Sequence, residues 1–187
     1  MKKIIALMLM PVLSGCFSSQ PPAITTWLVK PIEQSVDKLP RKFDSARVSQ
    51  VVMRSPYETS MMCILRGDGS VAFDYYNRFA TSPAAMLKGP SIDLIRSSGL
   101  FKSVCGPSSA LHTDLGIEII VTKFALDCTS PVPMAAAEVL ITVINQKDRA
   151  LVKAATGEAT MAIGEGDYAA AFSYAYTRAI SQALTKF

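Results

Sequence analysis

The stretch "LGIEIIVTKFALDC", residues 115–128, is a long run of strand-forming residues in which apolar side chains alternate on two different phases. Leu115, Ile117 and Ile119 follow the first phase. Ile120, Phe124 and Leu126 follow the second. Because successive side chains of a strand point to opposite faces, the change of phase predicts a β-bulge or a face that is buried at both ends.

Further strands are expected on both sides of this stretch. Two follow it, "AEVLITVINQ" and "ALVKAATGEATMAI", joined by a polar turn at residues 147–149. Short strands are expected before it in "TTWLVKPI", in "ARVSQVVMRSPY" and at residues 100–104. The clearest hairpin is "MMCILRGDGSVAFDYYNRF", with two strand-prone arms around residues 67–69. Its Arg-Gly-Asp triplet also occurs in integrin ligands, but a tight turn accounts for both glycines and the aspartate.

Two helices are expected. Ser82-Pro83 is typical of a helix start, and Gly99 of a left-handed helix end. Gly89-Pro90 lies between them, so this element is kinked there or forms two consecutive helices. Asp167 is a natural N-cap for a terminal helix with an alanine-rich apolar stripe, which permits close approach to a sheet.

The order of these elements predicts an α+β fold, an antiparallel β-sheet with two helices packed on one face. Serine and threonine residues of the terminal helix, among them Ser173, Thr177 and Ser181, are expected on its polar side, away from the apolar stripe.

The beginning of the chain has the layout of a lipoprotein signal peptide. Lys2 and Lys3 precede a short apolar run, which ends in "LSGC" at residues 13–16. Such a run is too short to span a bilayer, which needs roughly 20 apolar residues. We therefore expect a signal peptide at 1–15, a lipidated Cys16 with a tether to residue 26, and a single periplasmic α+β domain over 27–187.

Sorting follows from the residues after the cysteine. No aspartate, the inner-membrane retention signal of the enterobacterial kind, follows Cys16. We therefore expect the acyl chains to anchor the protein in the outer membrane, facing the periplasm, because two or three chains hold a protein where one does so only marginally.

Composition argues against several classes of protein. The net charge is +4, and the basic residues are scattered singly apart from the pairs Lys2-Lys3 and Arg41-Lys42, so no nucleic-acid partner is expected.

Cys63, Cys105 and Cys128 remain once Cys16 is lipidated. At most one intramolecular disulfide is expected among them, and Cys105–Cys128 is the least favoured pair, because an extended strand would separate its members.

Neither catalysis nor a cofactor is expected. The sequence has no G-x-S-x-G motif, no CxxC pair and a single histidine, His112, in "SSALHTD". One histidine cannot build a metal site with these cysteines at any usual spacing. Solvated strand positions account for the scattered acidic residues. We expect a protein that is not an enzyme and holds no metal.

Read in order, the elements resemble the ABC-type transport auxiliary lipoprotein family. The likeness covers roughly residues 27–187 and rests on packing patterns in five segments. These are "SPYETSMMCILRGDGSVAFDYYNRFATSPAAML", "IRSSGLFKSV", "TDLGIEIIVTKFALDC", "VLITVINQKDRALVKAATGEATMAI" and "YAAAFSYAYTRAISQAL". Members of the family accompany the MCE (mammalian cell entry) proteins of bacterial lipid-transport systems, including the paraquat-inducible system.

The resemblance implies an accessory lipoprotein that contacts an MCE-domain protein of an ABC-type intermembrane phospholipid transport system. The alternative is a structural or assembly lipoprotein of an outer-membrane or envelope machine, without lipid transport. A lipid carrier with its own cavity is a third hypothesis, which the alanine-rich and aliphatic composition disfavours. Self-association into a homo-oligomer stays open. Tyr75, Tyr76 and Phe79 are the candidate interface, because aromatic residues that a core does not need often carry binding energy. The alternative is that these rings fill the core under the first helix, which applies equally well to Phe79, whereas one of the two tyrosines must face outward in a strand.

Overall fold

The long strand expected at residues 115–128 forms the centre of the sheet as β6 (Leu115–Cys128). The structure is a computed structural model and describes residues 22–32, 36–164 and 166–187. Its elements follow in the order β1 (Thr25–Trp27), β2 (Phe43–Met53), β3 (Met61–Arg66), β4 (Val71–Phe79), α1 (Pro83–Ser98), β5 (Phe101–Cys105), β6, β7 (Met134–Asn145), β8 (Leu151–Ala162) and α2 (Tyr168–Thr185). The α+β fold class is confirmed.

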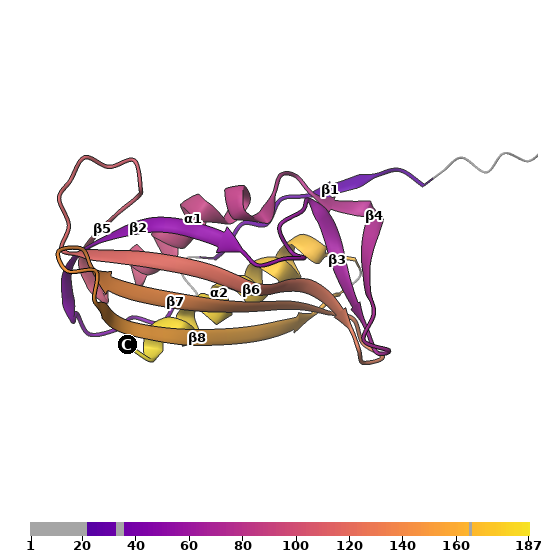
Figure 1. The fold of residues 1–187 in the computed structure, drawn as a ribbon. Coiled ribbons are helices and arrows are strands. Elements are labelled where there is room, and N and C mark those ends of the chain that lie inside the picture. Colours follow the sequence, from indigo (N-terminus) through magenta and orange to yellow (C-terminus); the bar gives the residue numbers. More distant parts are fainter. Residues whose placement is uncertain (1–21, 33–35, 165) are drawn as a thin grey trace, which may run out of the picture.

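The sheet is mixed, so the expectation of an antiparallel sheet was only partly right. β7 lies antiparallel to β6 along one side of that strand, and β8 lies antiparallel to β7. Along the other side of β6, β2 pairs in parallel with its first half and β3 with its last residues. β5 extends the β2 arm in parallel, whereas β4 and then β1 extend the β3 arm, so the sheet divides into two arms (Figure 1).

The predicted bulge in the central strand is present. The register between β6 and β7 shifts between Val121 and Lys123. Ile117, Ile119 and Val121 are buried before the shift, and Phe124 and Leu126 after it. The extra residue keeps apolar side chains on the helix-covered face along the whole strand, which explains the change of phase in the sequence.

Both described helices pack on the same face of the sheet (Figure 1). α1 is one continuous helix with Pro90 inside it, so the two-helix alternative does not hold. Pro83 at its start and Gly99 with φ of 78° at its end are as expected, but the Ser82 side chain makes no capping hydrogen bond. In α2 the predicted cap is confirmed, because the Asp167 side chain accepts a hydrogen bond from the Ala170 N–H at 2.9 Å.

An aromatic cluster fills the space between sheet and helices. Phe124 of β6 lies 4.8 Å from Phe172 of α2 and 6.2 Å from Tyr176, measured between ring centroids. Because the Ser91 Oγ donates its one proton to the Leu87 carbonyl at 2.6 Å, the buried Tyr176 hydroxyl donates to Ser91 at 2.6 Å. This hydrogen bond joins α1 to α2.

The polar side of α2 is covered rather than exposed, which corrects the expectation for it. Ser173, Thr177 and Ser181 are all buried. Their hydroxyl oxygens accept hydrogen bonds from the backbone N–H groups of Lys30, Ile32 and Asp37, at 3.0, 2.9 and 3.1 Å. Because the three residues are spaced by four, they form a row along one side of the helix, and this row is covered by Lys30, Ile32 and Asp37, which follow β1 in the chain.

The three described cysteines are free thiols. Cys105 is in register with Arg47, which is in register with Gly116 near the start of β6. Cys128 ends the same strand, so about 40 Å of extended chain separates the two cysteines, in agreement with the expectation that this is the least favoured pair. Neither helix in the described ranges is long and apolar enough to cross a membrane.

Candidate functional site

The candidate interface lies in a distorted part of β4. Met61 is in register with Arg78 but Met62 with Asp74, so residues 75–77 have no partners on β3. Strict alternation would turn only one of two successive tyrosines outward. Here the distortion exposes both, with 59% of Tyr75 and 40% of Tyr76 accessible to solvent.

Asp74 holds this distortion together. Its carboxylate accepts hydrogen bonds from the backbone N–H groups of Tyr76 at 2.8 Å and Asn77 at 3.0 Å, and from the Asn77 amide at 2.9 Å. Partial burial by itself would raise the pKa of Asp74, but these hydrogen bonds outweigh it and lower the pKa. The Asn77 side-chain oxygen accepts from the Trp27 indole at 3.0 Å, which ties the distortion to β1.

The exposed rings are oriented by their neighbours. Tyr75 and Tyr76 meet edge to face, with centroids 5.4 Å apart. The Arg78 guanidinium lies 4.6 Å from the Tyr75 centroid, and its Nε donates to the Tyr75 carbonyl at 3.0 Å. These contacts limit the rotamers of the two rings before any partner binds, which reduces the entropy that binding must remove.

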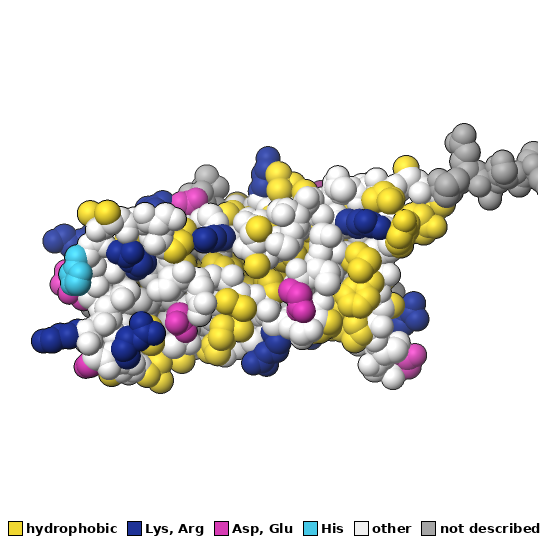
Figure 2. Space-filling view, turned by 45° about the horizontal axis from the view of Figure 1, so that its top comes forward, with side chains coloured by type: hydrophobic (Ala, Val, Ile, Leu, Met, Phe, Trp, Pro, Cys, Tyr) yellow, Lys and Arg dark blue, Asp and Glu magenta, His cyan; other side chains and the backbone are white. Residues whose placement is uncertain are grey.

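Other apolar side chains extend this surface. Val71 and Phe73 on the same strand are 48% and 41% exposed, and Ile24 and Leu28 flank β1 at 48% and 49%. Figure 2 shows hydrophobic side chains gathered over this end of the molecule, beside the point where the described chain begins. We call Ile24, Leu28, Val71, Phe73, Tyr75 and Tyr76 the tyrosine corner. Grouped apolar exposure of this kind is typical of interaction surfaces.

Phe79 belongs to the core and not to this surface, which corrects its place in the candidate interface. It is 3% exposed, and its ring centroid lies 5.2 Å from that of Phe124 and 5.3 Å from that of Phe172. The distortion ends before Phe79, so the residue returns to the helix-covered face of the sheet.

Cys16, the expected lipidation site, lies outside the described residues, as do residues 1–15 and part of the tether. The described chain reaches β1 directly beside the tyrosine corner, because Thr25 and Thr26 pair with Asn77 and Arg78. In the described part of the chain no group of three or more His, Cys, Asp or Glu side chains is placed to hold a metal ion.

The arrangement can bind a partner through aromatic and apolar contact, with Arg78 at its margin. The sequence carried a signal for the distortion in Asp74. Aspartate is rare in strands and typical of turns, where its side chain accepts hydrogen bonds from N–H groups two and three residues later. The parallel pairing of β1 with β4 had no local signal, because its two strands lie far apart in the chain.

Comparisons with known proteins identify the fold. No family model matches the chain, and no curated protein matches it. A solved structure of a DUF330-family protein from Xanthomonas campestris is similar at a TM-score of 0.60 and 17% identity, covering 88% of this chain and 89% of that one. An uncharacterized protein is similar at a TM-score of 0.52 and 12% identity, covering 80% and 92%. This chain shares its fold with both.

Proposed function

We propose that this chain is a lipid-anchored accessory subunit that binds the MCE-domain protein of an ABC-type intermembrane phospholipid transport system. Cys16 is its lipidation site, and it faces the periplasm from the outer membrane. The chain acts through protein–protein contact and carries no catalytic activity. The observation that carries the proposal is the tyrosine corner, an exposed aromatic surface held in shape by Asp74 and Arg78.

The packing of the domain supports a binding role over a lipid-carrier role. The space between sheet and helices holds the rings of Phe79, Phe124, Phe172 and Tyr176, where an acyl chain would have to lie. The short tether supports contact near the membrane, because nine residues from Cys16 to Thr25 reach at most about 30 Å.

The interface is tested by binding of the full chain to the periplasmic part of the cognate MCE protein. Tyr75→Ala and Tyr76→Ala should each weaken binding at least about tenfold, since tyrosines that become buried at an interface are frequent hot spots. Tyr174→Ala is the matched control, because Tyr174 is 39% exposed but lies on α2. The melting temperature should stay unchanged in all three variants.

Other outcomes separate the alternatives. If the wild-type chain binds none of the MCE proteins of its own genome, the transport proposal fails and the structural or assembly lipoprotein takes its place. If the tyrosine variants lose stability together with binding, the rings serve the fold. Binding to phospholipid vesicles is measured in parallel. If the tyrosine variants lose vesicle binding but keep binding to the MCE protein, the tyrosine corner contacts lipid.

The anchor is tested separately by intact-mass analysis of protein extracted from membranes. We expect loss of residues 1–15 and a mass increase that corresponds to acyl chains on Cys16. The variant Cys16→Ala should leave the membrane fraction. A mature chain that starts elsewhere, or a Cys16→Ala variant still held in membranes, would contradict this part of the proposal.

A further inference from the structure

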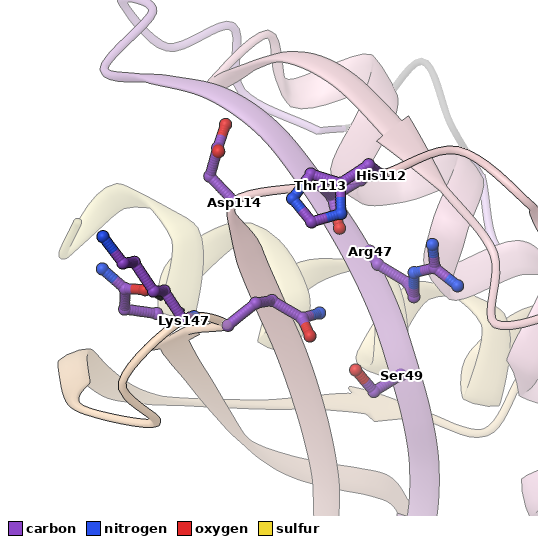
Figure 3. Close-up of a pocket in the computed structure, with 8 residues that line it drawn as sticks. Arg47, Ser49, His112, Thr113, Asp114 and Lys147 are labelled. Carbon is purple, nitrogen blue, oxygen red and sulfur yellow. Dashed lines mark hydrogen bonds between the residues drawn. The ribbon is translucent and has the colours of Figure 1, made fainter.

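A hollow lies at the opposite end of the sheet from the tyrosine corner. Its volume is about 520 Å³, and three segments meet there: β2, the loop that leads into β6, and the turn between β7 and β8. Figure 3 shows Arg47 and Ser49 from β2 together with His112 and Thr113 from the loop. All eight residues that line it carry polar or charged side chains.

Thr113 is the unusual member of this pocket. The residue is only 6% exposed, and its hydroxyl oxygen is buried without a hydrogen-bond partner. Buried hydroxyl groups are nearly always paired, because an unpaired one keeps the cost of leaving water. Thr113 lines the hollow, so a ligand bound there lies beside this residue and can supply the missing acceptor.

Arg47 sets the charge of the pocket and the shape of its wall. One of its terminal nitrogens donates to the Ser109 carbonyl at 2.9 Å, and the other donates to the Leu111 carbonyl. A guanidinium has five N–H donors, so donors remain for a ligand while these two bonds hold the group in place. Lys147 carries a second positive charge at the margin of the pocket, with its side chain directed away from Thr113 and Ser49 (Figure 3).

The one carboxylate of the pocket does not cancel these charges. Asp114 accepts a hydrogen bond from the Ser45 hydroxyl at 3.1 Å. Figure 3 shows its carboxylate turned away from the hollow between Thr113 and Ser49. The hollow therefore offers hydroxyl and guanidinium donors and a positive balance. Such a site suits an oxyanion with several acceptor oxygens.

We propose that this pocket binds a phosphate group, through the Arg47 guanidinium and the Thr113 and Ser49 hydroxyls. The ligand is either free phosphate or the phosphate of a lipid headgroup. The inference does not depend on the proposed function, because the pocket lies at the far end of β6 from the tyrosine corner and shares no residue with it.

The single histidine of the sequence makes the test direct. The full chain, labelled with ¹³C and ¹⁵N only at histidine, is titrated in neutral detergent with inorganic phosphate and, separately, with short-chain phosphatidylglycerol. Potassium chloride keeps the ionic strength constant, and the pH is fixed. The His112 ring signals should shift and saturate with one of the two ligands, and that ligand identifies the source of the phosphate.

Variants decide whether the pocket is responsible. Thr113→Val should weaken binding at least about tenfold, since a hydrogen bond to a charged group is lost. Thr113→Ser keeps the hydroxyl and should restore binding. Thr160→Val, on β8 and outside the pocket, should bind like the wild type. The proposal is overturned if neither ligand gives a saturable shift, or if Thr113→Val binds as tightly as wild type.

Discussion

At the scale of single residues, Gly157 shows how closely α2 approaches the sheet. A Cβ atom at this position would lie 2.0 Å from the Ala179 carbonyl oxygen and 2.6 Å from the Ala183 backbone nitrogen. Both contacts are with backbone atoms, which cannot rotate away. The small side chains of the α2 alanines and the missing side chain of Gly157 in β8 therefore together allow the helix to pack this close to the strand.

We predict that Gly157→Ala lowers the free energy of unfolding by at least about 2 kcal/mol, because the helix must move off the strand. Urea unfolding measures the change. Gly164→Ala is the control, since a Cβ there meets no atom within 4 Å, and it should change stability by less than about 0.5 kcal/mol. Equal stability of the two variants would show that α2 does not lie this close.

Tyr176 provides a second prediction at this scale, concerning pH. Burial raises the pKa of Tyr176 above its ordinary value of 10.0, and the hydrogen bond with Ser91 offsets only part of that rise. The folded protein therefore holds the phenolic proton more tightly than the unfolded chain does. Its contribution to stability is complete below pH 10 and is lost as the pH rises through the folded-state pKa.

We accordingly expect the free energy of unfolding to fall as the pH rises above about 10, and Tyr176→Phe to reduce the slope of that fall. Unfolding in urea across this range measures both. At neutral pH the same variant should cost about 1 kcal/mol, because one buried hydrogen bond is lost. A variant with the wild-type alkaline slope would place the effect on another residue.

At the scale of elements, the turn at 67–69 and the bulge in β6 could be predicted, because neighbouring residues in the chain determine them. The turn at 67–69 has Gly69 at φ of 82° and the Asp68 side chain accepting from the Ser70 N–H at 2.8 Å. The bulge in β6 followed from the phase of its apolar residues. The pairing of β2 and β3 with β6 could not be predicted in the same way, because parallel neighbours are joined through distant chain and leave no turn signature.

The row of hydroxyls on α2 was missed for a related reason. Serine and threonine on one side of a helix are typical of a solvated face, and only the tertiary structure shows that backbone N–H groups of another segment cover them. The exposed tyrosines were predictable as residue types, whereas the burial of Phe79 depends on where the distortion of β4 ends.

The hydroxyl row gives the prediction at this scale. Thr177→Val keeps the shape of the side chain but leaves the Ile32 N–H without its acceptor, and should cost about 1–2 kcal/mol of stability. Thr185→Val on the same helix is the matched control, because its hydroxyl bonds only the Gln182 carbonyl within the helix and is exposed. Hydrogen exchange of the Ile32 amide should accelerate in Thr177→Val alone; unchanged exchange would contradict the contact.

At the scale of the whole molecule, β6 separates two surfaces. The tyrosine corner lies by β3 and β4, which extend the end of β6 at Cys128, and the polar pocket lies at the end that begins with Leu115 (Figure 1). Fourteen residues of extended chain span about 45 Å. The chain enters the domain at the tyrosine corner, so a membrane anchor at Cys16 would hold that end close to the bilayer and leave the pocket distant from it.

The central claim is that the tyrosine corner contacts an MCE-domain protein, and site-specific photocrosslinking tests it most directly. A photoreactive phenylalanine analogue replaces Tyr76 in one strain and Tyr174 in another, and the crosslinked products are identified by mass spectrometry. We predict a crosslink to the MCE-domain protein from position 76 and none from position 174. A crosslink from position 76 to lipid alone, or equal crosslinks from both positions, would contradict the account.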